Sequence, residues 1–251
     1  MSLNLPTGIL SAASIQELAD ELGYFFHFKG LYELAHKAWK GAFTHRNTPP
    51  TVHDAAWCHD LELIGLKLHT RNRPGKALKY LCEALDYKET TLSHDDIKVC
   101  DTLVRIARAL VALHEPEEAE PYFRQALNGY AHLLSGSHAE ALQTSNEFAY
   151  SLACQATHAA VREAELLARR TLKARERYLG RIHQETVESV WTLGFAVEKV
   201  GRRADALHLY ERAYEEGRQL LGEEHVDVMD YKRDFDSLSW EDDETVQWLL
   251  L

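Results

Sequence analysis

Hydrophobic residues recur along the chain at the three- and four-residue spacing of a helix face, and no segment has the strict alternation of a strand. The segment 183–225 is the clearest example, with one apolar stripe before Gly201 and a second stripe after it. Gly222 follows the second stripe, at a place where glycine commonly closes a helix. The pattern predicts two amphipathic helices joined by a short turn.

The same two-helix pattern occurs five times. A small residue in the second helix recurs at intervals of 42, 42, 45 and 42 residues, and another small residue follows it seven positions later. A third small residue lies in the first helix, twelve positions before the first one. In the fourth unit the small residue fits this spacing only if a three-residue insertion lies within 154–161. Small side chains let two helix backbones approach closely, so each unit is predicted to be a packed helix pair. The three sets are Ala35, Ala77, Ala119, Ala164 and Ala206; Ala42, Ala84, Ala126, Thr171 and Ala213; and Gly23, Gly65, Ala107, Ala149 and Gly194.

Two junctions between units have similar sequences, LGRIHQETV at 179–187 and LGEEHVDVM at 221–229. With the 42-residue interval and the small positions, they resemble the tetratricopeptide repeat in its longer, kinesin light chain form. Residues 114–127, HEPEEAEPYFRQAL, are similar to that family's second helix. The resemblance covers about residues 15–235. It implies an all-α fold, a right-handed superhelical solenoid of about five helix pairs followed by a capping helix.

The expected organisation is a repeat array over residues 15–224 between two terminal segments. Residues 1–14 are expected to form an N-terminal extension, and residues 225–251 a capping helix with an acidic and aromatic tail. The expected units are 15–50, 51–93, 94–136, 137–181 and 182–224.

Two interpretations of the C-terminal tail stay open. Trp240 and the acidic residues 241–243 resemble the tryptophan–acidic peptides that kinesin light chain grooves bind, which would place the tail in the groove of its own or a neighbouring chain. Alternatively, Trp240, Trp248 and residues 249–251 cover the apolar end of the stack, as the last unit of a repeat array requires. Self-association through this end is a further alternative.

The chain carries a net charge of −11, most of it in the C-terminal part: residues 1–180 hold 20 basic and 22 acidic residues, and residues 181–251 hold 8 and 17. Nucleic acids and anionic membranes need a basic footprint, so neither is an expected partner. No apolar run reaches the ~20 residues of a membrane span. The N-terminus lacks the basic start of a secretory signal, and the four cysteines form no CxxC pair. We therefore expect reduced thiols in a cytoplasmic protein.

Most of the histidines are explained by the repeat rather than by chemistry. His27 and His69 lie 42 residues apart on two first helices, but two histidines without a third ligand of defined spacing do not make a zinc site. We expect no metal, no cofactor and no enzymatic activity. A small-molecule-binding protein or an enzyme that uses His27 and His69 is the alternative. The histidines that recur at unit junctions are His53, His94, His138, His183 and His225.

The resemblance implies that the first helices line a concave groove. Side chains three before and one after the small position of each first helix, or one turn further on, are then expected to face it. Arg105 and Arg108 lie in the middle, acidic residues in the first two units and aromatic residues in the last two. Aromatic residues beside arginines suit a protein or peptide ligand with an apolar anchor and an acidic residue. The candidate groove residues are Asp20, Tyr24, His27, Glu62, His69, Arg105, Arg108, Asn146, Tyr150, Trp191, Phe195 and Glu198.

The partner itself cannot be taken from the resemblance. Kinesin light chains carry paired asparagines in these helices, and only Asn146 matches one. The lysine and asparagine clamp of chaperone-binding relatives is not assembled either. The alternative interpretation of Tyr150, Trp191 and Phe195 is that these rings only pack between units. An adaptor, scaffold or regulatory module that binds a protein segment is the expected function.

Overall fold

The computed structural model describes residues 52–70, 72–93, 96–133, 138–155 and 157–249, together with Leu22, Leu34 and Lys37. Within these ranges all regular elements are α-helices. The chain divides into two compact units, residues 1–93 and 94–251. The rest of the predicted first helix pair, 15–50, lies outside the described residues, and with it the candidate groove residues Asp20, Tyr24 and His27.

The described part of the first unit is one helix pair, α3 (Val52–Thr70) packed on α4 (Pro74–Thr91). Gly65 lies in the contact between them, and a Cβ atom there would come within 2.8 Å of the Leu81 side chain. Leu81 is itself buried, so a larger residue at position 65 would force the helices apart. Asn72, in the turn, adopts a positive φ of 55°.

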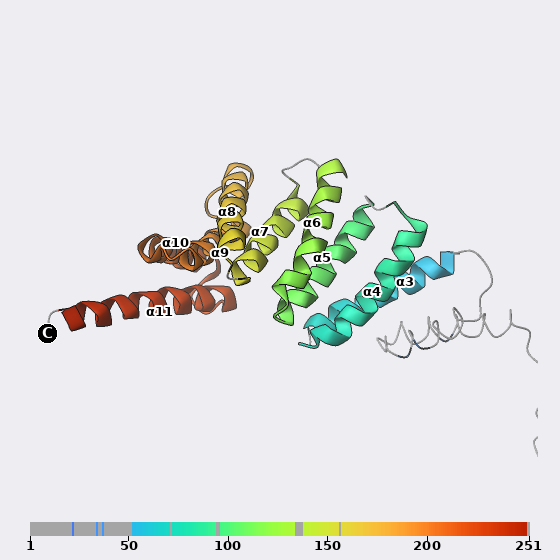
Figure 1. The fold of residues 1–251 in the computed structure, drawn as a ribbon, viewed down its shortest axis with the longest axis horizontal. Helices are drawn as coiled ribbons and strands as arrows, with labels where there is room; N and C mark the ends of the chain where they lie inside the picture. The colour runs from blue at the N-terminus through green and yellow to red at the C-terminus, as the bar shows by residue number, and fades with distance from the viewer. Residues whose placement is uncertain are drawn as a thin grey trace, which may run out of the picture. The chain divides into compact units, whose positions relative to one another are not determined.

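The described residues of the second unit form seven helices, and each packs on the next along the chain. In addition, α7 contacts both α5 and α9, so these three first helices lie side by side (Figure 1). The helices are α5 (Ile97–Ala112), α6 (Pro116–Leu133), α7 (Ala139–Cys154), α8 (His158–Tyr178), α9 (Gln184–Lys199), α10 (Arg203–Leu221) and α11 (Val226–Leu249).

The small residues of the repeat lie where the helices meet. Ala119, Ala164 and Ala206 have no exposed surface. A Cβ atom on Gly194 in α9 would lie 3.0 Å from the ring of Tyr210 in α10, the same relation that Gly65 has to Leu81. The predicted packing of each described helix pair through small residues is therefore confirmed.

A second set of equivalent residues forms polar links that the hydrophobic pattern does not reveal. Lys88, Tyr130 and Arg175 each lie four positions after the second small residue of their unit. Lys88 Nζ is 2.8 Å from Glu62 Oε1 in α3, and the Tyr130 hydroxyl donates to Asp101 Oδ1 in α5 over 2.5 Å. All three side chains are buried. The second helices α4 and α6 are thus joined to the first helices of their pairs, and Arg175 in α8 donates to the Glu185 carbonyl of α9, whereas α10 has Gly217 at the equivalent position.

Candidate functional site

In the first unit, the candidate groove residues Glu62 and His69 lie on α3. The Glu62 side chain is only 11% exposed and forms the ion pair with Lys88, so it presents little carboxylate to an open surface. His69 is half-buried, and its Nδ1 atom has no hydrogen-bond partner among the residues that the structure describes. The expected acidic entrance to the groove is therefore largely internal at Glu62.

On α5 the two arginines of the expected positive centre are both half-buried. Arg108 meets Glu147 of α7 in a two-point contact, with Nε to Oε2 and Nη2 to Oε1 both at 2.7 Å. The Arg108 side chain is 41% exposed. Its charge is thus balanced by a carboxylate from the next unit, which weakens the expected attraction for an acidic ligand residue.

Asn146 is buried rather than presented to a groove. Its Nδ2 donates to Thr192 Oγ1 over 3.0 Å, and its Oδ1 accepts a hydrogen bond from Ser189 over 3.0 Å. Both partners lie on α9. Asn146 therefore links two neighbouring first helices, and all of its described hydrogen bonds are internal.

Arg175 of α8 completes this internal polar layer, and the sequence analysis did not single it out. Its side chain has no exposed surface and donates to the Glu185 carbonyl at 2.7 Å, to Ser189 Oγ at 2.8 Å and to Gln143 Oε1. Glu188 Oε2 lies 3.6 Å away. Burial lowers the pKa of Arg175 and raises the pKa of Glu188, because both charged forms lose water.

The aromatic candidates lie together on α7 and α9. The Tyr150 ring is 5.7 Å from the Trp191 ring and 5.1 Å from the Phe195 ring, centroid to centroid. Trp191 also contacts Tyr231 of α11 at 6.2 Å, and its Nε1–H donates to Asp234 Oδ2 over 2.9 Å. Tyr150, Trp191 and Phe195 are all half-buried. They pack against one another and still keep part of their surface exposed.

Two further side chains lie beside this aromatic group. Lys199 Nζ lies 4.8 Å from the centroid of the Phe195 ring, within cation–π range. Glu198, a candidate groove residue, accepts a hydrogen bond from the Tyr210 hydroxyl over 2.7 Å. Glu198 therefore links the C-terminal end of α9 to α10.

A pocket of about 540 Å³ opens where α7, α9 and α11 meet, and we call it the Trp191 pocket. It lies in the size range of small ligand sites, ~300–1,000 Å³. Rings and carboxylates share its walls. The lining residues are Tyr150, Gln184, Glu188, Trp191, Asp227, Asp230, Tyr231 and Arg233.

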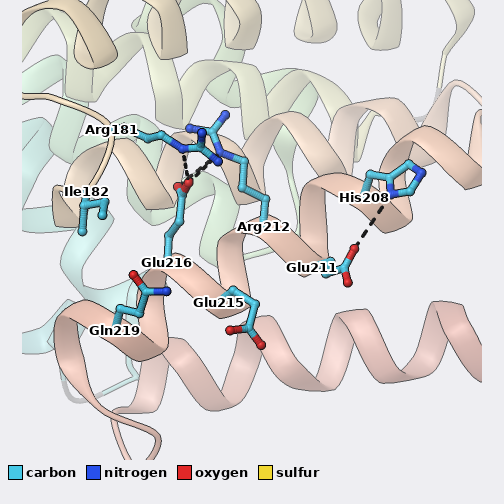
Figure 2. A pocket seen from close by; sticks show the side chains of 8 residues that line it. All are labelled: Arg181, Ile182, His208, Glu211, Arg212, Glu215, Glu216 and Gln219. Carbon is cyan, nitrogen blue, oxygen red and sulfur yellow. Dashed lines mark hydrogen bonds and ion pairs between the residues drawn. The ribbon is translucent and has the colours of Figure 1, made fainter.

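A second pocket, of about 500 Å³, is lined by α10 and the connection between α8 and α9. Figure 2 shows Arg181 and Arg212 converging on Glu216, and His208 beside Glu211. Arg212 also reaches Glu176 at 2.6 Å. The charged groups at the centre of this pocket neutralise one another. They come from α8, from α10 and from the connection between α8 and α9, which indicates a structural role for these ion pairs.

Among the residues that the structure describes, no three histidine, cysteine, aspartate or glutamate side chains are placed to hold a metal ion. Cys58 is buried, and its Sγ donates to the Ala84 carbonyl over 3.5 Å, a packing position. In the same part of the chain, no helix is both long and apolar enough to cross a membrane.

Two segments of the chain match the model of a known repeat family. Residues 99–140 and 192–227 match the family model of the tetratricopeptide repeat. No curated protein sequence matches the chain.

Solved structures extend the likeness to most of the chain. A Podosopora anserina protein, described as a kinesin light chain with nearly identical TPR-like repeats, has a TM-score of 0.60 at 20% identity, over 82% of this chain and 96% of that one. BtubC (BKLC) from P. vanneervenii has a TM-score of 0.61 at 17% identity, over 84% of each chain. A Rap protein complexed with Competence and Sporulation Factor has a TM-score of 0.54 at 15% identity, over 91% of this chain and 66% of that one. These likenesses confirm the predicted fold class, an all-α solenoid of helical repeats.

Proposed function

We propose that this chain is a protein–protein interaction module built on tetratricopeptide repeats, since two segments match that family and the fold resembles those of kinesin light chain-like repeat proteins. It holds a peptide or a segment of a partner protein on the exposed side of α7, α9 and α11. Catalysis is not part of this proposal. The cytoplasmic location and self-association through the C-terminal end stay predictions.

The Trp191 pocket is the observation that carries the proposal. It lies between helices of consecutive repeats, and half-buried aromatic rings form part of its wall. Tryptophan and tyrosine side chains in pockets that become well packed and lose their water on binding supply much of the binding energy at protein interfaces. The pocket and the row of Tyr150, Trp191 and Phe195 together offer an anchor site and a surface beside it.

Structures with the same fold give further support. The Rap protein noted above is complexed with Competence and Sporulation Factor. A second protein, the Rap conjugation gene regulator of the plasmid pLS20, is in complex with the Phr* peptide. The second has a TM-score of 0.53 at 17% identity. Peptide binding by those proteins makes the same kind of ligand a reasonable proposal for this chain.

The alternative role in small-molecule binding or catalysis rests on His27 and His69, and it gains no support. His27 lies outside the described residues. His69 has no cluster of candidate metal ligands around it in the described part of α3 and α4.

The proposal is tested by capturing partners from a cell lysate with three immobilised proteins. These are the wild type, Trp191→Ala, and Leu166→Ala as the control, which removes a 58% exposed apolar side chain from α8. Circular dichroism and thermal melts establish that each protein is folded. We expect a set of proteins captured by wild type and Leu166→Ala to be lost with Trp191→Ala. Equal capture by all three folded proteins would overturn the proposal.

A further inference from the structure

We propose that the Trp191 pocket takes a positively charged side chain, arginine or lysine, from the bound segment. This inference rests on the proposed function and names the chemistry of its anchor. It differs from the sequence-based expectation, in which an acidic ligand residue would meet Arg105 and Arg108.

Three acidic residues from two helices line the pocket, Glu188 from α9 and Asp227 and Asp230 from α11. Tyr231 lines the same pocket. Burial raises the pKa of the Tyr231 phenol, and the negative charges of Asp227, Glu188 and Asp230 raise it further. A cation in this pocket would therefore meet several carboxylates at once.

The charges of the protein itself leave the pocket negative. The lining residues and their direct ion-pair partners comprise four carboxylates, on Glu188, Asp227, Asp230 and Asp234, and two guanidinium groups, on Arg175 and Arg233. His225 Nδ1 lies 3.7 Å from Asp227 Oδ2 and accepts the backbone N–H of Asp227, so the neutral ring adds no positive charge. Arg175 is shared with Glu185. The excess of two negative charges favours a cationic ligand group and disfavours an acidic one.

The aromatic wall favours the same ligand group. A guanidinium or ammonium group is attracted to the face of a tryptophan or tyrosine ring. The chain already places a cation on this row of rings, since Lys199 lies over Phe195. Trp191 directs its indole N–H to Asp234, so the polar edge of the ring is occupied by α11. The ring of Trp191 is thus held in place as one wall of the pocket.

An acidic ligand residue would meet a weaker attraction at Arg108 than its charge alone suggests. Arg108 has its charge matched by Glu147 in a two-point contact. For the same reason, the acidic residues 241–243 of the tail are a poor match for the Trp191 pocket. A tail that entered this pocket would bring negative charge to an already negative site.

The test uses four small probes titrated into the full chain: the N-acetyl methylamides of arginine, lysine, citrulline and glutamate. Citrulline is the neutral, near-isosteric counterpart of arginine. Binding is followed by NMR at the indole N–H of Trp191, assigned with Trp191→Phe. We expect saturable shifts with arginine and lysine, binding about tenfold weaker with citrulline, and none with glutamate, because a charge-assisted contact is about twice as strong as a neutral one.

Variants of the pocket residues test whether the arginine probe binds in the Trp191 pocket. Glu188→Gln/Asp227→Asn should weaken arginine binding about tenfold, since it removes two pocket charges without large changes in shape. Glu211→Gln, at the second pocket, is the matched control and should bind like wild type. Equal binding of arginine and citrulline, or arginine binding that is unchanged in the double variant, would overturn the inference.

The outcomes also separate this inference from the proposed function. Loss of captured partners in Trp191→Ala without a preference for cationic probes would overturn the cationic anchor and leave the interaction module standing. Partners that are captured equally by wild type and Trp191→Ala would instead overturn the proposed function itself.

Discussion

Arg175 is a charged side chain without exposed surface that joins three helices. It connects α8 to Gln143 of α7 and to Glu185 and Ser189 of α9. Removing one partner of a buried polar network leaves the others without compensation, which costs more than the network contributes when intact. Arg175 therefore matters for the stability of the repeats beneath the proposed binding face.

Replacing Arg175 with methionine should lower the free energy of unfolding by about 3 kcal/mol. This is the lower end of the range for breaking a buried ion pair, and we expect it because Glu185 and Glu188 are partly exposed. Urea denaturation followed by circular dichroism measures the change. The control is Arg170→Met, an exposed position on the same helix, for which little change is expected. A loss below about 1 kcal/mol for Arg175→Met would contradict this assignment.

Glu188 gives a prediction about pH. Burial raises its pKa above the ordinary value, so the charged form is less favoured in the folded than in the unfolded chain. The attraction of Arg175 acts in the opposite direction but is the smaller effect, and Arg175 keeps Glu185, Ser189 and Gln143 as partners when Glu188 is neutral. The charge of Glu188 therefore reduces stability at pH values above the raised pKa, and the cost disappears as pH falls below the ordinary glutamate value. Glu188→Gln should melt at a higher temperature than wild type at about pH 8, and the difference should vanish towards about pH 4. A variant that is less stable than wild type at about pH 8 would contradict this.

At the scale of helices, stability depends on the close contact of the two helices in each pair. Gly194 of α9 lies against Tyr210 of α10, whose ring is buried and whose hydroxyl is bonded to Glu198. The ring has little freedom to move away from an added side chain. Small residues at this repeat position thus set the distance between the helices.

Gly194→Ala should destabilise the protein by about 1–3 kcal/mol through overpacking, partly offset by the ~1 kcal/mol helix preference of alanine over glycine. Gly75→Ala, at an exposed position in the first turn of α4, is the control and should leave stability unchanged or increase it. Thermal melts of both variants give the comparison. Equal or greater stability of Gly194→Ala would show that the contact is not tight.

The helix pairs were predictable because Gly65, Gly194 and the alanines recur at fixed intervals, and close packing admits only small residues there. The site was less predictable. The burial of Glu62 and Asn146 depends on partners in other helices, Lys88 and Ser189, that no local pattern identifies.

The charge of the site also depends on residues distant in the chain. Arg108 and Glu147 are 39 residues apart and meet only because α5 and α7 lie side by side. The carboxylates of the Trp191 pocket come partly from α11, a segment that was predicted as a cap or as a tail in the groove and not as part of the groove wall. The aromatic group of Tyr150, Trp191 and Phe195 was predicted as a set, but the acidic character of its pocket was not.

At the scale of the whole molecule, the last helix contributes both to stability and to the proposed site. Tyr231 and Leu238 of α11 are buried in the hydrophobic cluster formed with α9 and α10, and Arg203 donates to the Leu238 carbonyl. Asp227, Asp230 and Tyr231 also line the Trp191 pocket. In a repeat array the terminal element covers the apolar side of its neighbour, so this helix has both roles.

Two truncations separate the parts of this helix. Ending the chain after Ser239 keeps the residues that pack on α10, and we expect helicity and melting temperature close to those of the full chain. Ending it after Glu224 removes Tyr231 and Leu238 from the cluster, together with the buried Val228, and should cause aggregation and a lower melting temperature. Aggregation of the chain that ends after Ser239 would instead show that residues 240–251 are the essential cover.

The most direct test of the central claim is the affinity of a captured partner segment, measured by calorimetry with wild type, Trp191→Ala and Leu166→Ala. Because an interface anchor costs about 2 kcal/mol or more when truncated, we predict at least about thirtyfold weaker binding for Trp191→Ala and wild-type affinity for Leu166→Ala. Equal affinities for all three folded proteins would contradict a binding site at Trp191.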